Sequence, residues 1–448
     1  MKKRFFGTDG IRGEANKWPM TAETALHLGM AAGTYFKRHN QSNLVIIGKD
    51  TRRSGYMLEF ALVSGFAAVG MEVRIIGPVP TPAVGILTRS LRADLGVMIS
   101  ASHNGFADNG IKLFGPDGFK LSDEQELEIE KLLENPEAIK RSPPHQIGQV
   151  KSFEDARGRY VEFAKFAFPR GARLDGLRVA VDCANGAAYK TAPWALRELG
   201  AEVVEIAVEP NGMNINDGCG STDLGLLKRK VLERRADIGI GLDGDADRIA
   251  IIDDKGNEID GDQIIAAIAR DMVEQGTLKG GAVVTTIMSN LGLEKFLKSI
   301  GVELIRTDVG DRQVVAAMRE KGCNLGGEQS GHIVSLDYAT TGDGLISALL
   351  VLGAMSHNGK KSSEILNCFK PAPQIKKNIR YSGTSPLANK EIAKQVEEVK
   401  KSLEENGARL VVRTSGTEPL VRLMAEGDDV DYLEKTINSL AKIVSGEK

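Results

Sequence analysis

The stretch from Ala93 to Asn104 reads A-D-L-G-V-M-I-S-A-S-H-N, and it decides the fold class. Its apolar run, Leu95–Ile99, has the length and composition of a buried strand, and it leads directly into small polar residues. In open α/β sheets, ligands bind beyond the carboxyl ends of the strands. Ser102 lies at such a strand end, so it is either a nucleophile or an ordinary turn serine.

This strand and its polar loop end a longer pattern of strands and helices. The pattern occurs three times along the chain, beginning near Asn43, Arg178 and Ala282. Each copy is expected to contain a strand, a helix that stops at glycine, a second strand, and a third strand followed by a polar loop. The third-strand loops contain Ser102 in the first copy, D-G-D-A-D-R in the second and G-G-E-Q-S-G-H in the third. Parallel crossovers place helices on both faces of each sheet, and the repeated loops predict domains that converge on one cleft.

The last part of the chain departs from this plan. Pro371 and Pro373 mark a linker, and the pattern that follows is strand, helix, strand, loop, strand, helix. We therefore expect an α/β protein with three similar domains of mixed, mostly parallel sheets and a smaller C-terminal α+β domain. The expected boundaries are 1–153 for the domain with Ser102, 154–253 for a metal-binding domain, 254–369 for a sugar-binding domain and 370–448 for a phosphate-binding domain.

The second polar loop carries three carboxylates, Asp243, Asp245 and Asp247. Residues that alternate on an extended backbone point to one side, so these three carboxylates could face together. Oxygen ligands this close repel each other unless a cation neutralises them, and Mg²⁺ prefers such ligands. A solvated acidic turn is the alternative, and the apolar strands on both sides make it the weaker one.

Two other interpretations of this loop fail. An EF-hand needs glycine at its sixth position and glutamate at its twelfth, where this chain has Arg248 and Asp254. The segment also matches G-x-G-x-x-G, but a dinucleotide site needs a helix next, and R-I-A-I-I-D is typical of a strand.

The C-terminal loop R-T-S-G-T-E-P, beginning at Arg413, offers two hydroxyls, a glycine and nearby Arg422. An arginine fork with closely approaching backbone amides suits a phosphate group. An ordinary β-turn is the alternative, because turns also favour Ser, Gly and Thr.

The bulk composition narrows the class of protein. The chain has 448 residues, with 26% charged and 42% hydrophobic residues, which is ordinary for a globular protein of several domains. A formal net charge of −2 gives no long-range attraction to nucleic acid or to an anionic membrane. No apolar run approaches the ~20 residues that span a bilayer. The four cysteines show neither paired nor zinc-like spacing, which fits a reducing cytoplasm.

Five motifs in order resemble those of the α-D-phosphohexomutase family, and the likeness covers essentially the whole chain. They are F-G-T-D-G-I-R-G from Phe6, S-A-S-H-N from Ser100, D-G-D-A-D-R from Asp243, G-E-Q-S-G-H from Gly327 and R-T-S-G-T-E-P from Arg413. The first motif and Gln329 resemble the bacterial members that act on glucosamine phosphate. One departure is Gly105 with Phe106, where members commonly have proline and an aromatic residue; it predicts a more mobile loop.

The resemblance implies a phosphoserine enzyme that interconverts glucosamine 6-phosphate and 1-phosphate. Ser102 would carry the phosphoryl group and, with the three aspartates, bind one Mg²⁺. Glucosamine 1,6-bisphosphate would be the intermediate and activator. The other implied residues fall into three groups: Arg12, Lys112 and His332 near the reacting hydroxyl, with His103 and Arg248 positioning the loops; Glu328, Ser330, Asp308 and Gly310 on the sugar; and Arg413, Ser415, Gly416, Thr417 and Arg422 on the distal phosphate.

Lys112 is the candidate general acid or base, if nearby cations lower its pKa; the alternative is a solvated lysine at a strand end. The expected partners are small sugar phosphates, without nucleic acid or membrane, and a homodimer is one candidate assembly.

Three other functions stay open on the sequence. A mutase acting on mannose or glucose phosphate differs only in the loops that contact the sugar. A Mg²⁺-dependent phosphatase would pass the phosphoryl group to water, which a closed cleft excludes. A non-catalytic sugar-phosphate sensor would not need Ser102 or the three aspartates.

Overall fold

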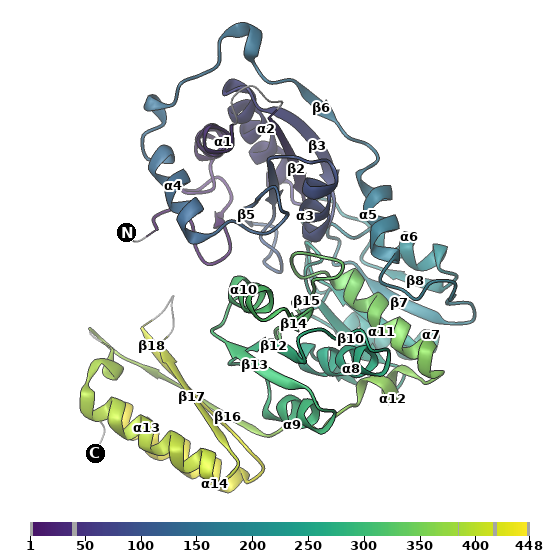
Figure 1. The fold of residues 1–448 in the computed structure, drawn as a ribbon, viewed down its shortest axis with the longest axis vertical. Helices are drawn as coiled ribbons and strands as arrows, with labels where there is room; N and C mark the ends of the chain where they lie inside the picture. Colours follow the sequence, from purple (N-terminus) through teal and green to yellow (C-terminus); the bar gives the residue numbers. More distant parts are fainter. Residues whose placement is uncertain (1–2, 38–42, 384, 415–418, 446–448) are drawn as a thin grey trace.

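The computed structural model describes residues 3–37, 43–383, 385–414 and 419–445. Their strands form four separate sheets that follow one another along the chain (Figure 1). Three sheets are mixed and carry helices, and the fourth is smaller and antiparallel. The expected fold class is confirmed: three similar α/β domains and a C-terminal domain.

The first sheet has the strand order β1-β5-β4-β2-β3-β6. Its central strands β2, β3 and β4 are parallel, whereas β5 runs antiparallel to β4 and to β1. Ser122 begins α4 with a capping box, in which its side chain accepts from the Gln125 amide. The elements are β1 (Ile11–Glu14), α1 (Ala22–Phe36), β2 (Leu44–Lys49), α2 (Ser54–Ala68), β3 (Glu72–Pro78), α3 (Thr81–Ser90), β4 (Leu95–Ile99), β5 (Asp108–Phe114), α4 (Asp123–Leu133), η1 (Pro136–Ala138), η2 (Pro144–Gln146) and β6 (Val150–Ser152).

The second sheet has the order β11-β10-β9-β7-β8, with β7 parallel to β8 and β9. Strand β10 returns antiparallel to β9, and the three aspartates lie in the connection between these strands. Strand β11 pairs with β10, so this sheet continues beyond residue 253, where the sequence had suggested a boundary. The elements are α5 (Ala156–Lys165), β7 (Arg178–Asp182), α6 (Thr191–Glu198), β8 (Glu202–Ile206), α7 (Gly225–Arg234), β9 (Ile238–Leu242), β10 (Ile249–Asp253) and β11 (Glu258–Ile259).

The third sheet has the order β13-β12-β14-β15 and repeats the plan, because β15 again returns antiparallel to β14. Gly70, Gly200 and Gly301 follow α2, α6 and α9 at equivalent places and have φ of 86°, 101° and 76°. These left-handed glycines end the helices, as the sequence predicted. The elements are α8 (Gly261–Glu274), β12 (Ala282–Thr286), α9 (Leu291–Ser299), β13 (Glu303–Thr307), α10 (Asp311–Lys321), β14 (Leu325–Gly327), β15 (Ile333–Ser335), α11 (Gly344–Asn358) and α12 (Ser362–Leu366).

The C-terminal domain has the strand order β16-β18-β17, and both of its strand pairs are antiparallel. It has a hydrophobic core of its own, which includes Leu403, Val421 and Leu440. Figure 1 shows it as a separate body beside the third domain. The elements are β16 (Gln374–Arg380), η3 (Pro386–Ala388), α13 (Lys390–Glu405), β17 (Arg409–Thr414), β18 (Leu420–Glu426) and α14 (Val430–Ser445).

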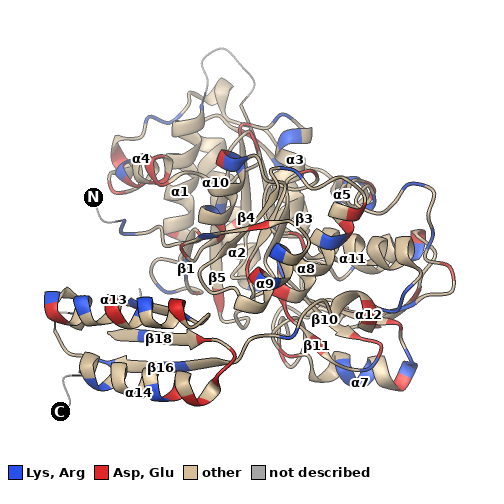
Figure 2. Cartoon of the chain, turned by 60° about the horizontal axis from the view of Figure 1, so that its bottom comes forward, with Lys and Arg blue, Asp and Glu red and all other residues tan. Residues whose placement is uncertain are grey.

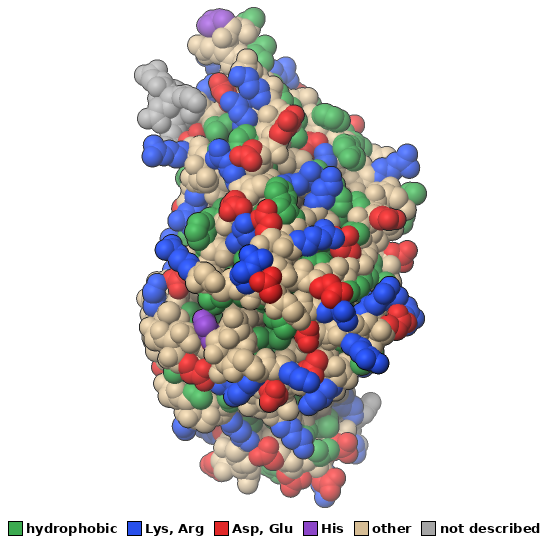
Figure 3. Space-filling model, turned by 90° about the vertical axis from the view of Figure 1, so that its right-hand side faces the viewer, with side chains coloured by type: hydrophobic (Ala, Val, Ile, Leu, Met, Phe, Trp, Pro, Cys, Tyr) green, Lys and Arg blue, Asp and Glu red, His purple; other side chains and the backbone are tan. Residues whose placement is uncertain are grey.

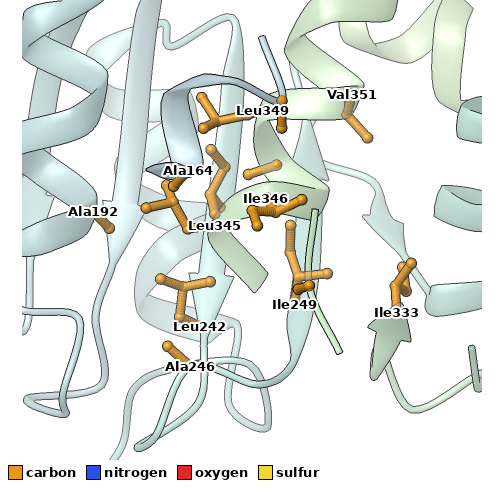
Figure 4. Close-up of a cluster of buried hydrophobic side chains, with 14 of the residues drawn as sticks. Ala164, Ala192, Leu242, Ala246, Ile249, Ile333, Leu345, Ile346, Leu349 and Val351 are labelled. Carbon is orange, nitrogen blue, oxygen red and sulfur yellow. The ribbon is translucent and has the colours of Figure 1, made fainter. Parts of the chain in front are cut away.

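The second and third domains share one hydrophobic core (Figure 4), which also includes first-domain residues such as Val84 and Met98. Leu345, Ile346 and Leu349 of α11 pack in it with Leu242 of β9 and Ile249 of β10, on either side of the aspartate loop. Ala246, within that loop, is also completely buried in this core. The loop is therefore anchored at both ends and in its middle, which makes it a rigid support for charged side chains.

Charged residues of both signs are spread over the surface. Along α13 and α14 they alternate (Figure 2), and the face drawn in Figure 3 is likewise a mixture of Lys, Arg, Asp and Glu. Among the helices of the described ranges, none combines the length and apolar character that crossing a membrane requires.

Candidate active site

Ser102 lies between β4 and β5 and is almost completely buried. Its φ is +54°, a left-handed conformation that is costly for a residue other than glycine. Its hydroxyl donates to Asp243 Oδ2 at 2.6 Å, across the interface between the first two domains. His103 Nδ1 lies 3.4 Å from the same hydroxyl oxygen. Serine loop and aspartate loop, equivalent in the repeats, are thus in direct contact.

Three residues that the sequence did not single out hold the serine loop. Arg52 donates to the main-chain oxygens of Ser102 and Asn104, at 2.9 Å in both cases. Asp50 holds Arg52 Nε at 2.7 Å, and Asn216, from the second domain, donates to the same two carbonyls. These three residues lie in no motif or periodic pattern of the sequence, so these contacts could not be predicted from it.

The three aspartates come together through a turn rather than through the extended backbone that their alternation had suggested. Ala246 has a φ of +58°, and its amide bonds back to the Asp243 carbonyl at 3.0 Å. One ligand oxygen from each carboxylate lies within 4.8 Å of the other two, and all three residues are buried. The predicted cluster is confirmed, whereas its predicted backbone geometry is wrong.

These carboxylates fit a divalent cation. Oδ1 of Asp245 and Oδ1 of Asp247 are buried and have no hydrogen-bond partner, which is costly unless a ligand satisfies them. Burial, together with the charges of Asp247 and Asp245, raises the pKa of Asp243 well above its usual value. A hard cation would remove both the repulsion and the unsatisfied oxygens, and Ser102 Oγ is adjacent.

Lys112 is a buried residue in β5 and not a solvated lysine. Its Nζ donates to Asp245 Oδ2 at 2.8 Å and to Asp247 Oδ2 at 3.2 Å. Burial opposes its charge, but Asp245, Asp247 and Asp9 raise its pKa well above the usual value. In this arrangement the carboxylates outweigh Arg12, whereas the predicted lowering of the pKa, which relied on Mg²⁺ beside the ammonium as well, stays a prediction.

Asp9 organises the edge of the site, and the sequence identified it only as a member of the first motif. It pairs with Arg12, with Lys112 at 3.3 Å and with Lys120 at 2.5 Å. Lys120 also pairs with Asp311, the first residue of α10, so it joins the first domain to the third. Neither lysine pairing could be predicted, because the partners are distant in sequence.

His332 brings the third loop into the same cluster. It is buried, with Nδ1 3.6 Å from Asp247 Oδ1 and Nε2 3.7 Å from Asp311 Oδ2. Burial disfavours its charge, but these carboxylates raise its pKa above the usual value. The pKa of His103, by contrast, is lowered by burial and by Arg248 and Arg12. Arg248 itself donates its main-chain amide to Asp243 Oδ1 at 3.1 Å.

The residues expected on the sugar border this cluster. Glu328 is half-buried and lies close enough to Arg248 to help raise the pKa of that guanidinium. Ser330 and Asp308 are exposed, and Gly310 adopts a φ of 137° just before α10. The amide of Gln329 donates to Asp260 Oδ2 at 3.1 Å.

Arg413 and Arg422 are cross-strand partners on β17 and β18. Burial and the neighbouring Arg422 charge lower the pKa of Arg413, and Arg422 Nε is buried without a hydrogen-bond partner. Two like charges in such positions repel, which favours an anion between them. Within the described ranges, no hydrogen bond or ion pair joins either arginine to the other loops. Ser415, Gly416 and Thr417 lie outside the described residues.

The structure thus gathers a serine hydroxyl, three carboxylates, a buried lysine and a histidine from three domains. Comparison with known families also divides the chain into four parts. Residues 3–140, 159–256 and 260–372 match the phosphoglucomutase/phosphomannomutase alpha/beta/alpha domains I, II and III, and residues 384–443 match the C-terminal domain. The chain belongs to this family.

Relatives within the family are similar over their full length. The phosphoglucosamine mutase of Agrobacterium fabrum is 56% identical over 100% of this chain and 99% of its own. That of Brucella anthropi is 58% identical with the same coverage. Among solved structures, a phosphoglucomutase/phosphomannomutase family protein from Burkholderia thailandensis superposes with a TM-score of 0.82 at 23% identity, covering 99% of this chain and 97% of the other. At this low identity, the structural similarity supports the fold of this chain and not its substrate.

Proposed function

We propose that this enzyme is a phosphoglucosamine mutase, which interconverts glucosamine 6-phosphate and glucosamine 1-phosphate through a phosphoserine at Ser102. The product would supply the synthesis of amino-sugar nucleotides and cell-wall precursors. The observation that carries the proposal is the 2.6 Å contact between Ser102 Oγ and Asp243 Oδ2, inside a buried carboxylate cluster. The full-length relatives named phosphoglucosamine mutase support the choice of substrate.

The proposed reaction has two phosphoryl transfers. In the first, the bond between phosphorus and Ser102 Oγ breaks and a bond forms to the free hydroxyl of the substrate. The proton of that hydroxyl passes through a base to Ser102 Oγ. The product is glucosamine 1,6-bisphosphate, which turns within the cleft. In the second transfer, its other phosphate returns to Ser102 Oγ, whose proton leaves to the departing sugar oxygen. At the end of the cycle Ser102 is phosphorylated again, and the sugar again carries one phosphate.

The residues around Ser102 are suited to these steps. Asp243, Asp245, Asp247 and Ser102 would hold one Mg²⁺, which neutralises oxygen charge during phosphoryl transfer. Arg12, Lys112 and His332 would orient the reacting hydroxyl, and Lys112 or His332 would exchange its proton, while His103 and Arg248 position the two loops. Lys112 touches both Asp245 and Asp247, so it can hold a proton beside the phosphoryl oxygens.

The other end of the substrate needs separate binding groups, since each phosphate must take either position. We place the sugar at Glu328, Ser330, Asp308 and Gly310, and the distal phosphate at Arg413, Ser415, Gly416, Thr417 and Arg422. The unpartnered Arg422 Nε supports an anion site in the C-terminal domain. We also propose a cytoplasmic location, which the free cysteines among the described residues support, and a homodimer, which a solution mass would test.

The test is turnover of the purified protein with Mg²⁺ and trace sugar 1,6-bisphosphate, comparing kcat/KM for glucosamine, mannose and glucose 6-phosphates. We expect the amino sugar to be strongly preferred. Preference for mannose or glucose would keep the mechanism and make the enzyme a phosphomannomutase/phosphoglucomutase. Release of free phosphate without any 1-phosphate would instead indicate a phosphatase.

Substitution of the nucleophile separates a mutase from a sugar-phosphate sensor. Ser102→Ala should abolish turnover while sugar phosphate still binds, because the hydroxyl is needed only to carry the phosphoryl group. Intact mass after incubation with the bisphosphate should show one added phosphoryl group on the wild type and none on Ser102→Ala. Unchanged turnover of the variant would exclude the phosphoserine mechanism.

A further inference from the structure

The main-chain oxygens of the serine loop are held from two sides. Ser102 O and Asn104 O each accept one bond from Arg52 Nη2 and one from Asn216 Nδ2, and all four distances are 2.9 Å. Arg52 follows β2 in the first domain, whereas Asn216 lies in the loop between β8 and α7 of the second. Two donors from different domains therefore grip the same pair of carbonyls.

All three nitrogens of the Arg52 guanidinium donate hydrogen bonds. Its side chain is fully buried, and Nη1 donates to Gly105 O and, at 3.1 Å, to Asp108 O. Its Nε binds Asp50 Oδ2 at 2.7 Å, so the guanidinium is neutralised on one edge and faces carbonyls on the others. A lysine cannot reproduce this pattern, because its single ammonium lacks the planar fork of arginine.

The same system reaches the amide of Ser102. Asp50 Oδ2 accepts from Ser100 Oγ at 2.6 Å, and Ser100 Oγ accepts from the Ser102 amide at 2.9 Å. Ser102 is thus held at both its N–H and its C=O. A left-handed serine persists only where its surroundings over-determine it, and this network provides that constraint.

We propose that Arg52 and Asn216 form a carbonyl clamp that keeps Ser102 in its left-handed conformation, with Oγ aimed at the aspartate loop. Both are positioning residues, because they touch the loop backbone rather than the substrate. Asn216 acts only when the second domain is seated on the first, so the clamp couples domain packing to the aim of the nucleophile. The proposal rests on the proposed mutase function, in which Ser102 carries the phosphoryl group.

Two conservative variants test the clamp. Arg52→Lys keeps a cation beside Asp50 but removes most of the carbonyl contacts. Asn216→Gly removes the amide donor while retaining a residue that tolerates the local φ of +57°. The matched control is Arg53→Lys, at the neighbouring exposed arginine.

We expect Arg52→Lys to lower kcat on the order of 100-fold, because small displacements of a reacting group have effects of that size. Asn216→Gly should lower kcat less, and KM should change little in both, since neither residue contacts the sugar. The rate at which sugar 1,6-bisphosphate phosphorylates Ser102, followed by intact mass, should fall in parallel. Because both side chains bind the same carbonyls, the double variant should show non-additive effects.

Hydrogen exchange of the peptide covering residues 100–108 provides a readout that does not depend on turnover. The clamp predicts faster exchange in both variants than in Arg53→Lys, at similar melting temperatures. Wild-type kcat and wild-type exchange in Arg52→Lys and Asn216→Gly would overturn the clamp. If the wild type turned over no sugar phosphate, the proposed function would fail. The clamp would then be judged by hydrogen exchange alone, and unchanged hydrogen exchange in the two variants would reject it.

Discussion

Gly105 is a residue of the serine loop whose backbone does not need glycine. A Cβ built there meets nothing within 4 Å, and its φ lies outside the left-handed region. Its carbonyl, which accepts from Arg52, would be unchanged by a methyl group. Gly105→Ala should therefore raise the free energy of unfolding by about 0.4–1 kcal/mol, through lower entropy of the unfolded chain. Denaturant unfolding would measure this, and a loss of stability would show a requirement for glycine.

The carboxylate cluster allows a test of the metal that is independent of activity. Mg²⁺ should raise the melting temperature of the wild type, because it neutralises three buried carboxylates only in the folded state. The stabilisation at 100 times the dissociation constant is about 2.7 kcal/mol. Asp245→Asn should weaken the effect, since it removes one charge and alters the ligand set at Asp245 Oδ1, which has no other partner. An equal Mg²⁺ response in the variant would place the ion elsewhere.

At the scale of elements, α8 begins with a buried carboxyl that should make stability depend on pH. Burial, with the nearby charge of Asp260, raises the pKa of Asp262 from 3.8 to about 7, and its Oδ2 accepts from the Asn290 amide at 2.8 Å. The folded state then binds this proton more tightly than the unfolded state. Its contribution to stability is complete below pH 4 and is lost as the pH rises through 7.

Asp262→Asn should remove this contribution to the pH dependence. The amide oxygen can still accept from Asn290, so the link between α8 and α9 is retained. Relative to the wild type, the variant should gain stability between pH 5 and pH 8, by at most about 1.4 kcal/mol for each unit of pKa shift. Thermal unfolding at several pH values would measure this. Parallel curves for the two proteins would show that Asp262 is not the titrating group.

The elements themselves were largely predictable, because their signals are local. The apolar runs that became β4, β9 and β12, and the glycines that end α2, α6 and α9, follow from composition and spacing. Contacts between elements leave no such signal. The pairing of Ser102 with Asp243 could be inferred from the equivalence of the repeats and from the family resemblance, whereas Arg52, Asn216 and Lys120 could not be found at all. Nor does the sequence show how many carboxylates surround the Lys112 ammonium in space, and these carboxylates raise its pKa.

At the scale of the whole molecule, the domains are joined unequally. The first three share one apolar core, to which each contributes buried residues, and the Lys120–Asp311 ion pair also ties the first to the third. The C-terminal domain has its own core and is linked to the third by polar contacts, such as that from Arg409 to the Ser289 carbonyl at 2.9 Å. We therefore expect the catalytic cluster to be rigid and the C-terminal domain to be the part that responds to the substrate.

The arginine pair of this domain makes that expectation testable. Arg413 and Arg422 face each other across β17 and β18, and their repulsion is relieved when an anion binds between them. Inorganic phosphate should therefore raise the melting temperature of the wild type, and Arg422→Gln should largely abolish the effect. The same variant should raise KM for glucosamine 6-phosphate. The rate at which saturating bisphosphate phosphorylates Ser102 should fall by a smaller factor. Lys376→Gln, at an exposed position on β16 of the same sheet, is the matched control. If both variants kept the full phosphate response, the distal phosphate would have to bind outside this pair, and the C-terminal domain would lose its proposed role.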